Sequence, residues 1–299
     1  MKKNNLRCFV CESFDKKLLF KKNKYDFYKC NRCDIVNINP IPSIKILDKY
    51  YASKNKLGLN YDVTQYQEKK YVDYDFCEHI ISSTRFNKSD YILDIGCYCG
   101  QLLDAYKNKG YMNLYGIEMQ LKAYSIAKNK HNNIFNITLE KFCKNNNYRG
   151  KFDYIIASGL IEHLRDPIIL FQSSKFLLKD NGYLIIQTPF ADSILAKVFS
   201  KYWPPYTAPE HINYFTQKSF DILLSKYNFR KISLKRHFKK LKIDYVFKMF
   251  RTFGTDLLFF IKFLEKITPN FIKNTFLIFY GGEKIIICQK KNSVQNKYY

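Results

Sequence analysis

The stretch Tyr91-Ile-Leu-Asp-Ile-Gly-Cys-Tyr-Cys-Gly100 decides the fold of this chain of 299 residues. Its first half, 91–95, is a short apolar run that is typical of a buried strand. Its second half is a loop bounded by two glycines, and the segment from Gln101 to Lys109 that follows has helical spacing and is closed by Gly110. A strand that turns through a glycine loop into a helix indicates the first unit of an α/β fold.

The same alternation continues along the chain, where apolar runs typical of strands are separated by segments with helical spacing. The predicted strands are 91–95, 114–118, 134–137, 152–158, 182–188, 230–234 and 284–289, and the predicted helices are 101–109, 121–129, 167–178 and 219–227. The pattern predicts an α/β fold with a Rossmann-like, seven-stranded, mostly parallel sheet and helices on both faces.

The carboxyl ends of the first two strands carry residues suited to a nucleoside ligand. Asp94 and the glycine loop end the first strand, and Glu118 ends the second, where its carboxylate can accept both hydroxyls of a ribose. The loop lacks the spacing G-x-G-x-x-G, and no Walker lysine follows it. The sequence therefore predicts a nucleoside cofactor without a diphosphate.

The pattern Asp94-x-Gly96-x-x-x-Gly100, followed by an acid at the end of the second strand, resembles the class I S-adenosylmethionine-dependent methyltransferases. Two further motifs, Glu162-His163-Leu-Arg-Asp-Pro167 and Ala208-Pro-Glu-His211, are similar to one branch, the deoxysugar C-methyltransferases and related enzymes of bacterial glycan clusters. Tyr98 departs from the family pattern, because a glycine is common at its position. The resemblance implies that S-adenosylmethionine is bound by Asp94, Gly96, Gly100, Glu118, Leu139, Glu140 and Ser158.

Four cysteines near the amino terminus have the spacing of a metal site. Cys8 and Cys11 form one C-x2-C pair, Cys30 and Cys33 form another, and the residues between the pairs indicate a β-hairpin. Two such pairs complete a closed tetrahedral site, so the sequence predicts a small zinc ribbon with a structural Zn²⁺ ion. The resembling methyltransferases of glycan clusters also carry an amino-terminal ribbon.

Methyl transfer is a displacement at a sulfonium, which needs alignment and often a base for the incoming nucleophile. The candidate bases are His163 and His211. The resemblance implies that His211 is the base and that Glu210 orients it, whereas His163 is expected to brace the helix that starts at Asp166-Pro167. Which of the two histidines accepts the proton stays open.

We expect five segments along the chain: a zinc ribbon (1–42), a helical connector (43–88), an S-adenosylmethionine-binding core (89–234), a helical hydrophobic insertion (235–282), and the last core strand with a polar tail (283–299). Apolar residues in the insertion recur at helical steps: Val246, Phe250, Phe253, Leu257, Phe260, Leu264 and Ile267. A helical pair packed on the substrate domain or on a dimer partner is the first interpretation. An interfacial helix on anionic lipid is the second.

The net charge of +24 comes mostly from lysines scattered along the chain, and only eight residues are arginine. Nucleic-acid binding favours a concentrated basic stripe, which is not found, so we do not expect it. The start has no apolar signal region, and no apolar run approaches the roughly 18 residues that span a bilayer. We therefore expect a cytoplasmic protein, and a peripheral membrane contact stays open.

The function that these features favour is methylation of a small molecule on carbon or oxygen. The resemblance implies a sugar or sugar-nucleotide intermediate of surface polysaccharide biosynthesis, with a sugar nucleotide or a lipid-linked glycan as the acceptor. The alternative is a zinc-ribbon nucleic-acid-binding protein or an RNA methyltransferase. The sequence does not decide the acceptor or the oligomeric state.

Overall fold

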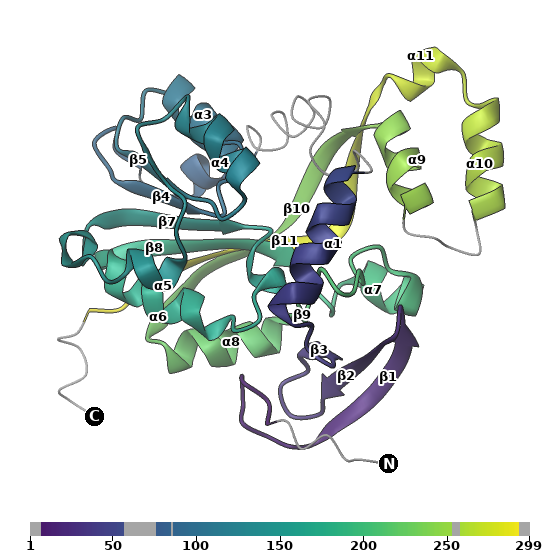
Figure 1. The fold of residues 1–299 in the computed structure, drawn as a ribbon, viewed down its shortest axis with the longest axis horizontal. Coiled ribbons are helices and arrows are strands. Elements are labelled where there is room, and N and C mark those ends of the chain that lie inside the picture. Colours follow the sequence, from purple (N-terminus) through teal and green to yellow (C-terminus); the bar gives the residue numbers. More distant parts are fainter. Residues whose placement is uncertain (1–6, 57–75, 85, 253–257, 293–299) are drawn as a thin grey trace.

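The computed structural model describes residues 7–56, 76–84, 86–252 and 258–292. Two sheets organise them (Figure 1). The larger sheet has seven strands in the order β10-β11-β8-β7-β4-β5-β6, and the smaller has four in the order β1-β2-β3-β9. The prediction of a Rossmann-like, seven-stranded, mostly parallel sheet is confirmed.

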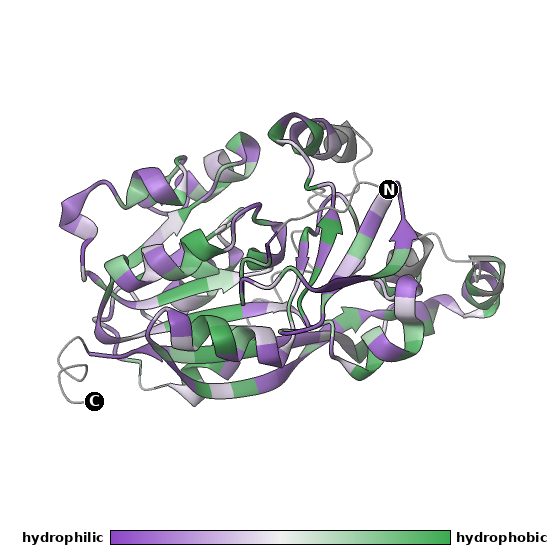
Figure 2. Ribbon diagram, turned by 90° about the horizontal axis from the view of Figure 1, so that it is seen from below, coloured by the Kyte–Doolittle hydropathy of each residue, from purple (hydrophilic) through white to green (hydrophobic). Residues whose placement is uncertain are grey.

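The inner part of the larger sheet is parallel. Its parallel strands are β4 (Ile92–Ile95), β5 (Leu114–Ile117), β6 (Asn133–Phe135), β7 (Phe152–Ser158) and β8 (Leu178–Pro189), and the antiparallel partner strands are β11 (Phe276–Lys290) and β10 (Phe229–Lys242). The inner strands are almost continuous apolar runs because both of their faces are covered, and they are largely hydrophobic in Figure 2. The carboxyl ends of the parallel strands meet at one edge, which is where the candidate site lies.

Helices cover both faces of this sheet. On one face, the helical residues 76–83, α3 (Gln101–Asn108) and α4 (Leu121–Lys128) contribute side chains such as Phe76, Leu103 and Ala127 to one buried cluster. On the other face, α5 (Leu139–Phe142), α6 (Ile168–Leu177) and α8 (Gln217–Lys226) contribute side chains such as Phe142, Phe171 and Leu223 to a second. The burial of these two clusters holds the strand ends, and thus the site, in place.

The smaller sheet joins the cysteine-rich segment to a strand far along the chain. β1 (Lys16–Lys22) and β2 (Tyr25–Cys30) form the predicted hairpin, and β3 (Val36–Asn39) pairs with both β2 and the distant β9 (Asn213–Tyr214). A third buried cluster joins Phe27 and Ile38 of the ribbon to Trp203 and Tyr206 of the loop after α7 (Ile194–Phe199). The ribbon therefore shares its core with the loop that carries His211.

The predicted connector begins with α1 (Ile44–Lys56), which lies across the front of the molecule in Figure 1. It resumes as the helical residues 76–83, while 57–75 lie outside the described residues. The described residues also form three short 3₁₀ turns: Asn146–Tyr148, Ile161–His163 and Ser200–Tyr202. The second of these turns carries two residues of the candidate site.

The strands that flank the insertion are longer than predicted. The expected ends, Leu234 for β10 and Lys284 for β11, are wrong, because the two strands stay paired as far as Lys242 and Phe276. Residues 235–242 are rich in lysine, so nothing in the sequence indicated a strand there. The strand forms because it pairs with the apolar, mostly aromatic run Phe276–Tyr280. The division of the chain into five segments stays a prediction.

The helical part of the insertion consists of α9 (Ile243–Thr252), α10 (Leu258–Ile267) and α11 (Asn270–Lys273), which project from the end of the hairpin in Figure 1. Of the predicted apolar stripe, Phe253 and Leu257 lie outside the described residues. Among the helices described, none combines the length and the apolar character needed to cross a bilayer.

Candidate active site and metal centre

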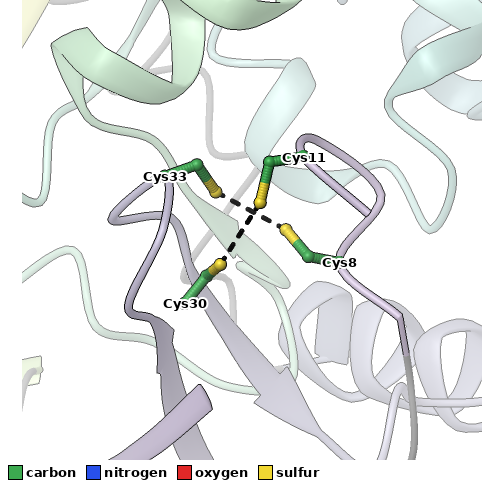
Figure 3. A group of neighbouring side chains, drawn as sticks. All are labelled: Cys8, Cys11, Cys30 and Cys33. Carbon is green, nitrogen blue, oxygen red and sulfur yellow. Dashed lines mark hydrogen bonds between the residues drawn. The ribbon is translucent and has the colours of Figure 1, made fainter. Parts of the chain in front are cut away.

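The four cysteines lie on two knuckles with the same backbone geometry (Figure 3). In each knuckle, the residue after the second cysteine, Glu12 or Asp34, has a φ of 64°. Its N–H donates to the carbonyl of the first cysteine, at 2.8 Å for Cys8 and 2.9 Å for Cys30. This repeated turn aims the thiol groups of both pairs at one point.

The cluster fits a zinc ion. The Sγ atoms of Cys8 and Cys33 are 3.5 Å apart, as are those of Cys11 and Cys30, and all four lie within 4.8 Å of one another. Four Zn–S bonds of about 2.3 Å give sulfur–sulfur separations of about 3.8 Å, close to these distances. The hydrogen bond from Cys33, which outweighs burial, lowers the pKa of Cys8 to about 5, so a thiolate is available. Four sulfur ligands leave no open position, which is typical of a structural site.

The glycine loop after β4 is built by left-handed backbone. Gly96, Tyr98 and Gly100 have φ values of 78°, 50° and 81°. The N–H groups of Gly96 and Cys97 donate to the carbonyl of Ile117, at 2.8 and 3.1 Å, and tie the loop to β5. Tyr98 thus adopts the positive φ that a glycine would take more readily.

Glu118 meets this loop at the end of β5. Its carboxylate accepts from the N–H of Tyr98 at 2.9 Å and from the N–H of Gln120 at 2.7 Å. Both carboxylate oxygens are therefore held in position by backbone N–H groups, and a carboxylate oxygen can accept more than one hydrogen bond. Asp94, which is 3% exposed, is the second-last residue of β4 and lies just before the loop.

Gly116 was not singled out in the sequence, although the loop depends on it. A Cβ atom at this position would lie 2.7 Å from the Sγ of Cys97 and 2.8 Å from the Cδ1 of Ile134. Only glycine allows the loop to pack this closely on β5. The signal that could have found it is a glycine in the middle of an apolar strand.

The other predicted cofactor residues are spread along the same edge. Leu139 is buried in the core at the start of α5, and Glu140 is exposed in the first turn of that helix. Ser158 ends β7 and donates its hydroxyl to Oε1 of Gln187 at 3.0 Å. The roles of these three residues in cofactor binding stay predictions.

The two candidate bases lie next to each other. The ring centroids of His163 and His211 are 4.6 Å apart, with the ring planes at 86°. Nδ1 of His211 lies 2.7 Å from the carbonyl oxygen of Pro205, and Nδ1 of His163 lies 3.1 Å from that of Glu210. His163 was expected to brace the start of α6. A hydrogen bond within that start is made by the N–H of Ile168, which donates to Oδ1 of Asp166.

The carboxylate of Glu210 accepts from the hydroxyl of Tyr50 at 3.0 Å. Burial, together with the charge of Glu210, raises the pKa of Tyr50, so this tyrosine stays a donor. The ring of His211 is held by the carbonyl of Pro205. The predicted orienting role of Glu210 is not tested by this geometry and stays a prediction.

The site contains residues that the sequence reasoning missed. Glu162 is 3% exposed, and its Oε2 accepts from the hydroxyl of Thr188 at 2.8 Å. Burial raises the pKa of Glu162. The hydroxyl of Tyr51, in α1, lies 3.4 Å from Nδ1 of His163. Glu162 stood in the quoted motif next to His163, whereas α1 gave no signal beyond its two adjacent tyrosines.

The cofactor loop and the histidine pair lie along one edge of the sheet. Leu160, which follows β7, lies close enough to the loop that a Cβ on Gly96 would come within 3.2 Å of its side chain. The next turn carries Glu162, whose carbonyl accepts from the N–H of Ile212 at 2.8 Å, immediately after His211. The arrangement can hold a nucleoside on one side and accept a proton on the other.

Comparison with known proteins gives matches to methyltransferases. A family model described as a methyltransferase domain matches residues 69–234, more than half of the chain. The ubiquinone biosynthesis O-methyltransferase of Actinobacillus pleuropneumoniae is 34% identical over 106 residues, which are 32% of this chain and 44% of that protein. The chain thus spans less than half the length of this curated relative.

A second relative is the ribosomal RNA small subunit methyltransferase A of Malacoplasma penetrans, which is 27% identical over 177 residues, 58% of this chain and 60% of that protein. Among solved structures, a SAM-dependent methyltransferase from Archaeoglobus fulgidus superposes with a TM-score of 0.52 at 19% identity and covers 77% of this chain and 100% of that one. This last likeness shows the fold alone.

Proposed function

We propose that this chain, which belongs to the methyltransferase-domain family, transfers a methyl group from S-adenosylmethionine to a sugar or sugar nucleotide. The acceptor would be an intermediate of surface polysaccharide biosynthesis, free or linked to lipid, and the methylated atom a carbon or an oxygen. The observation that carries the proposal is the pair of imidazole rings, 4.6 Å apart, on the same sheet edge as Glu118 and the glycine loop. A sugar hydroxyl or an acidic sugar carbon needs such a base, whereas a ready nucleophile does not.

The cofactor would be held by its ribose and its methionine part. Glu118 would accept from the ribose hydroxyls, and Gly96 and Gly100 would let the backbone approach the methionine part, with Asp94 near its ammonium group. Leu139 and Glu140 would lie toward adenine, and Ser158 toward the methionine side. S-adenosylmethionine supplies an activated methyl group on its sulfonium, and the residues of this chain align the acceptor with it.

His211 would accept the proton of the acceptor. Because a carbonyl oxygen only accepts, the contact with Pro205 at 2.7 Å places the hydrogen on Nδ1 and leaves the lone pair on Nε2. Glu210 would favour the cationic form of the ring through its charge and would fix the loop through Tyr50. His163 would border the same space.

The test is a methyl-transfer assay with labelled S-adenosylmethionine and a panel of sugar nucleotides. Transfer to one or more of them is expected, and transcripts of ribosomal RNA in the same assay should stay unlabelled. The RNA relative named above makes this control necessary. Transfer to RNA alone would reject the sugar proposal and leave the methyltransferase activity.

The insertion offers a surface that would contact membranes. Phe259 and Phe263 of α10, Phe271 of α11 and Ile278 of β11 are 85%, 51%, 73% and 72% exposed. They lie among lysines of the same segment: Lys240, Lys242, Lys262, Lys266 and Lys273. Exposed aromatic residues beside lysines fit an anionic lipid surface. A protein in the cytoplasm could thereby reach lipid-linked acceptors.

Co-sedimentation with vesicles tests this contact. Binding to vesicles that contain phosphatidylglycerol is expected, with little binding to pure phosphatidylcholine, and Phe271→Ser should weaken it several-fold. Met112, which is 78% exposed between α3 and β5, provides the matched control as Met112→Ser. Equal binding of the two variants would reject the contact.

A further inference from the structure

We infer that Glu162, His163 and His211 form a second metal site, which takes a divalent ion of the zinc type. Each of the three side chains offers one ligand atom, and these atoms lie within 4.8 Å of one another. The inference deepens the proposed function and rests on it for the role of His211, but ion binding itself does not require the proposed acceptor. Imidazole and carboxylate ligands together favour zinc, cobalt or nickel over magnesium and calcium.

Backbone carbonyl groups orient both imidazole rings so that they can act as metal ligands. Nδ1 of His211 lies 2.7 Å from the carbonyl oxygen of Pro205, and Nδ1 of His163 lies 3.1 Å from the carbonyl oxygen of Glu210. Since carbonyl oxygens accept and never donate, these contacts favour the tautomer with the hydrogen on Nδ1 and the lone pair on Nε2. The hydroxyl of Tyr51 also lies near Nδ1 of His163, at 3.4 Å, but the carbonyl is the closer partner. A carbonyl behind the second ring nitrogen is the usual support of a histidine that binds a metal.

The carboxylate of Glu162 is the third ligand. Its Oε2 is used by the hydroxyl of Thr188 at 2.8 Å, while Oε1 lies 4.0 Å from Nε2 of His163. Glu162 is only 3% exposed, and within the described part of the chain no lysine or arginine forms an ion pair with it. Burial disfavours the ionised form of this carboxyl, and a divalent ion between Oε1 and the two rings would stabilise that form.

The backbone already places the three groups close to binding geometry. Tetrahedral ligand bonds of about 2.0–2.2 Å put neighbouring ligand atoms about 3.4 Å apart, so the 4.0 Å between Oε1 of Glu162 and Nε2 of His163 would have to close by about 0.6 Å. Rotation of the side chains suffices for this. Three protein ligands leave a coordination position open, in contrast to the closed set of four cysteines.

The ion would compete with the acceptor's proton for Nε2 of His211. The proposed base uses the lone pair on Nε2 of His211, and the same lone pair would bind the ion. Methyl transfer should therefore fall as the ion binds, and the ion concentration for half-inhibition should match the one for half-saturation.

Cobalt is the probe, because Co²⁺ reports its ligands by its visible spectrum. The full chain is prepared with one equivalent of zinc in the ribbon and then titrated with Co²⁺ alone. A second equivalent should bind with weak visible bands and without the strong charge-transfer bands of thiolate ligands. His163→Ala and His211→Ala should each weaken this binding at least about tenfold, whereas His79→Ala, outside the cluster, should not change it.

Three results would overturn the site: no second equivalent in the unaltered protein, thiolate bands in its spectrum, or cobalt binding by both cluster variants that equals the binding by the unaltered protein. Glu162→Gln, which keeps the shape of the side chain and can still accept from Thr188, provides a third variant if an alanine variant fails to fold. The proposed function is tested separately by the activity readout. Cobalt binding that raises methyl transfer would keep the metal site and reject His211 as the base.

Discussion

In the described part of the chain, two groups of side chains bring their ligand atoms within 4.8 Å of one another, yet they differ in how the chain builds them. The four cysteines come from two knuckles that repeat one local turn, so short-range sequence spacing assembles most of the cluster. The second cluster combines a turn after β7, which carries Glu162 and His163, with a loop before β9, which carries His211. Packing between distant segments of the chain therefore assembles this cluster. The first cluster is closed by four ligands, and the second has an open side.

The two clusters are linked by the smaller sheet. The N–H of Ile38 in β3 donates to the carbonyl of Ile212 at 3.1 Å, one residue after His211. The hydroxyl of Thr216, which caps α8, donates to the carbonyl of Cys33 at 3.3 Å. The closed cluster therefore supports the open one: the ribbon is the scaffold against which the loop of His211 is folded.

The largest effect should come from breaking the closed cluster. Cys33→Ser removes one of four zinc ligands, and a structural zinc contributes on the order of 10 kcal/mol to such a segment. We expect the zinc content to fall from one per chain to near zero, and stability and methyl transfer to be lost together. Metal analysis and thermal unfolding measure the first two, and the labelled-cofactor assay measures the third.

The matched control is Cys143→Ser, a half-buried cysteine outside the cluster. It should keep its zinc and its activity. Full activity of zinc-free Cys33→Ser would show that the ribbon does not support the loop of His211.

The next effect concerns the open cluster alone. His211→Ala removes the proposed base, so turnover should fall about a hundredfold or more, since general bases contribute about 10²–10⁴. Zinc content and S-adenosylmethionine affinity should stay unchanged, because neither the ribbon nor the loop at Glu118 is altered. His163→Ala should cost less, and an inactive His163→Ala beside an active His211→Ala would move the base to His163.

A smaller effect is expected at Glu118, which belongs to neither cluster. Glu118→Ala removes charge-assisted bonds to the ribose, so S-adenosylmethionine affinity should fall about tenfold, equivalent to roughly 1.4 kcal/mol. Calorimetric titration measures the affinity, and metal analysis should show full zinc. Unchanged affinity in a folded variant would reject the assignment of the ribose site.

Sequence could predict the parts of this molecule that depend on neighbours along the chain. The knuckles, the strands β4 to β8 and the glycine loop have local signatures, and β7 has the bounds expected for it. Tyr50 had no such signature, and the motif that contains Glu162 did not show its burial, because the partners of these two residues lie about 26 to 160 residues away along the chain. The extension of β10 was not predicted for the same reason, because this lysine-rich strand forms by pairing with β11, which is distant in the sequence.

The smallest effect should come from the link between the two clusters. Nδ2 of Asn37 in β3 donates to Oδ1 of Asn213 at 2.7 Å, and Nδ2 of Asn213 donates to the carbonyl of Leu164, next to His163, at 2.7 Å. Asn213 is 3% exposed, so Asn37→Ala would leave a buried acceptor without this bond, at a cost of about 1 kcal/mol. Turnover should fall a few-fold while zinc stays bound, because the loop shifts and the knuckles do not.

Asn31→Ala provides the matched control for this link. Asn31 lies in the same ribbon, is exposed, and donates to Asp15 at 2.7 Å, so its loss should leave turnover unchanged. Steady-state kinetics on the two zinc-loaded variants measure the difference. If both variants turn over at the rate of the unaltered protein, the amide link does not carry support from the ribbon to the histidines. The shared core around Trp203 and Tyr206 would then be the structure that couples the two clusters.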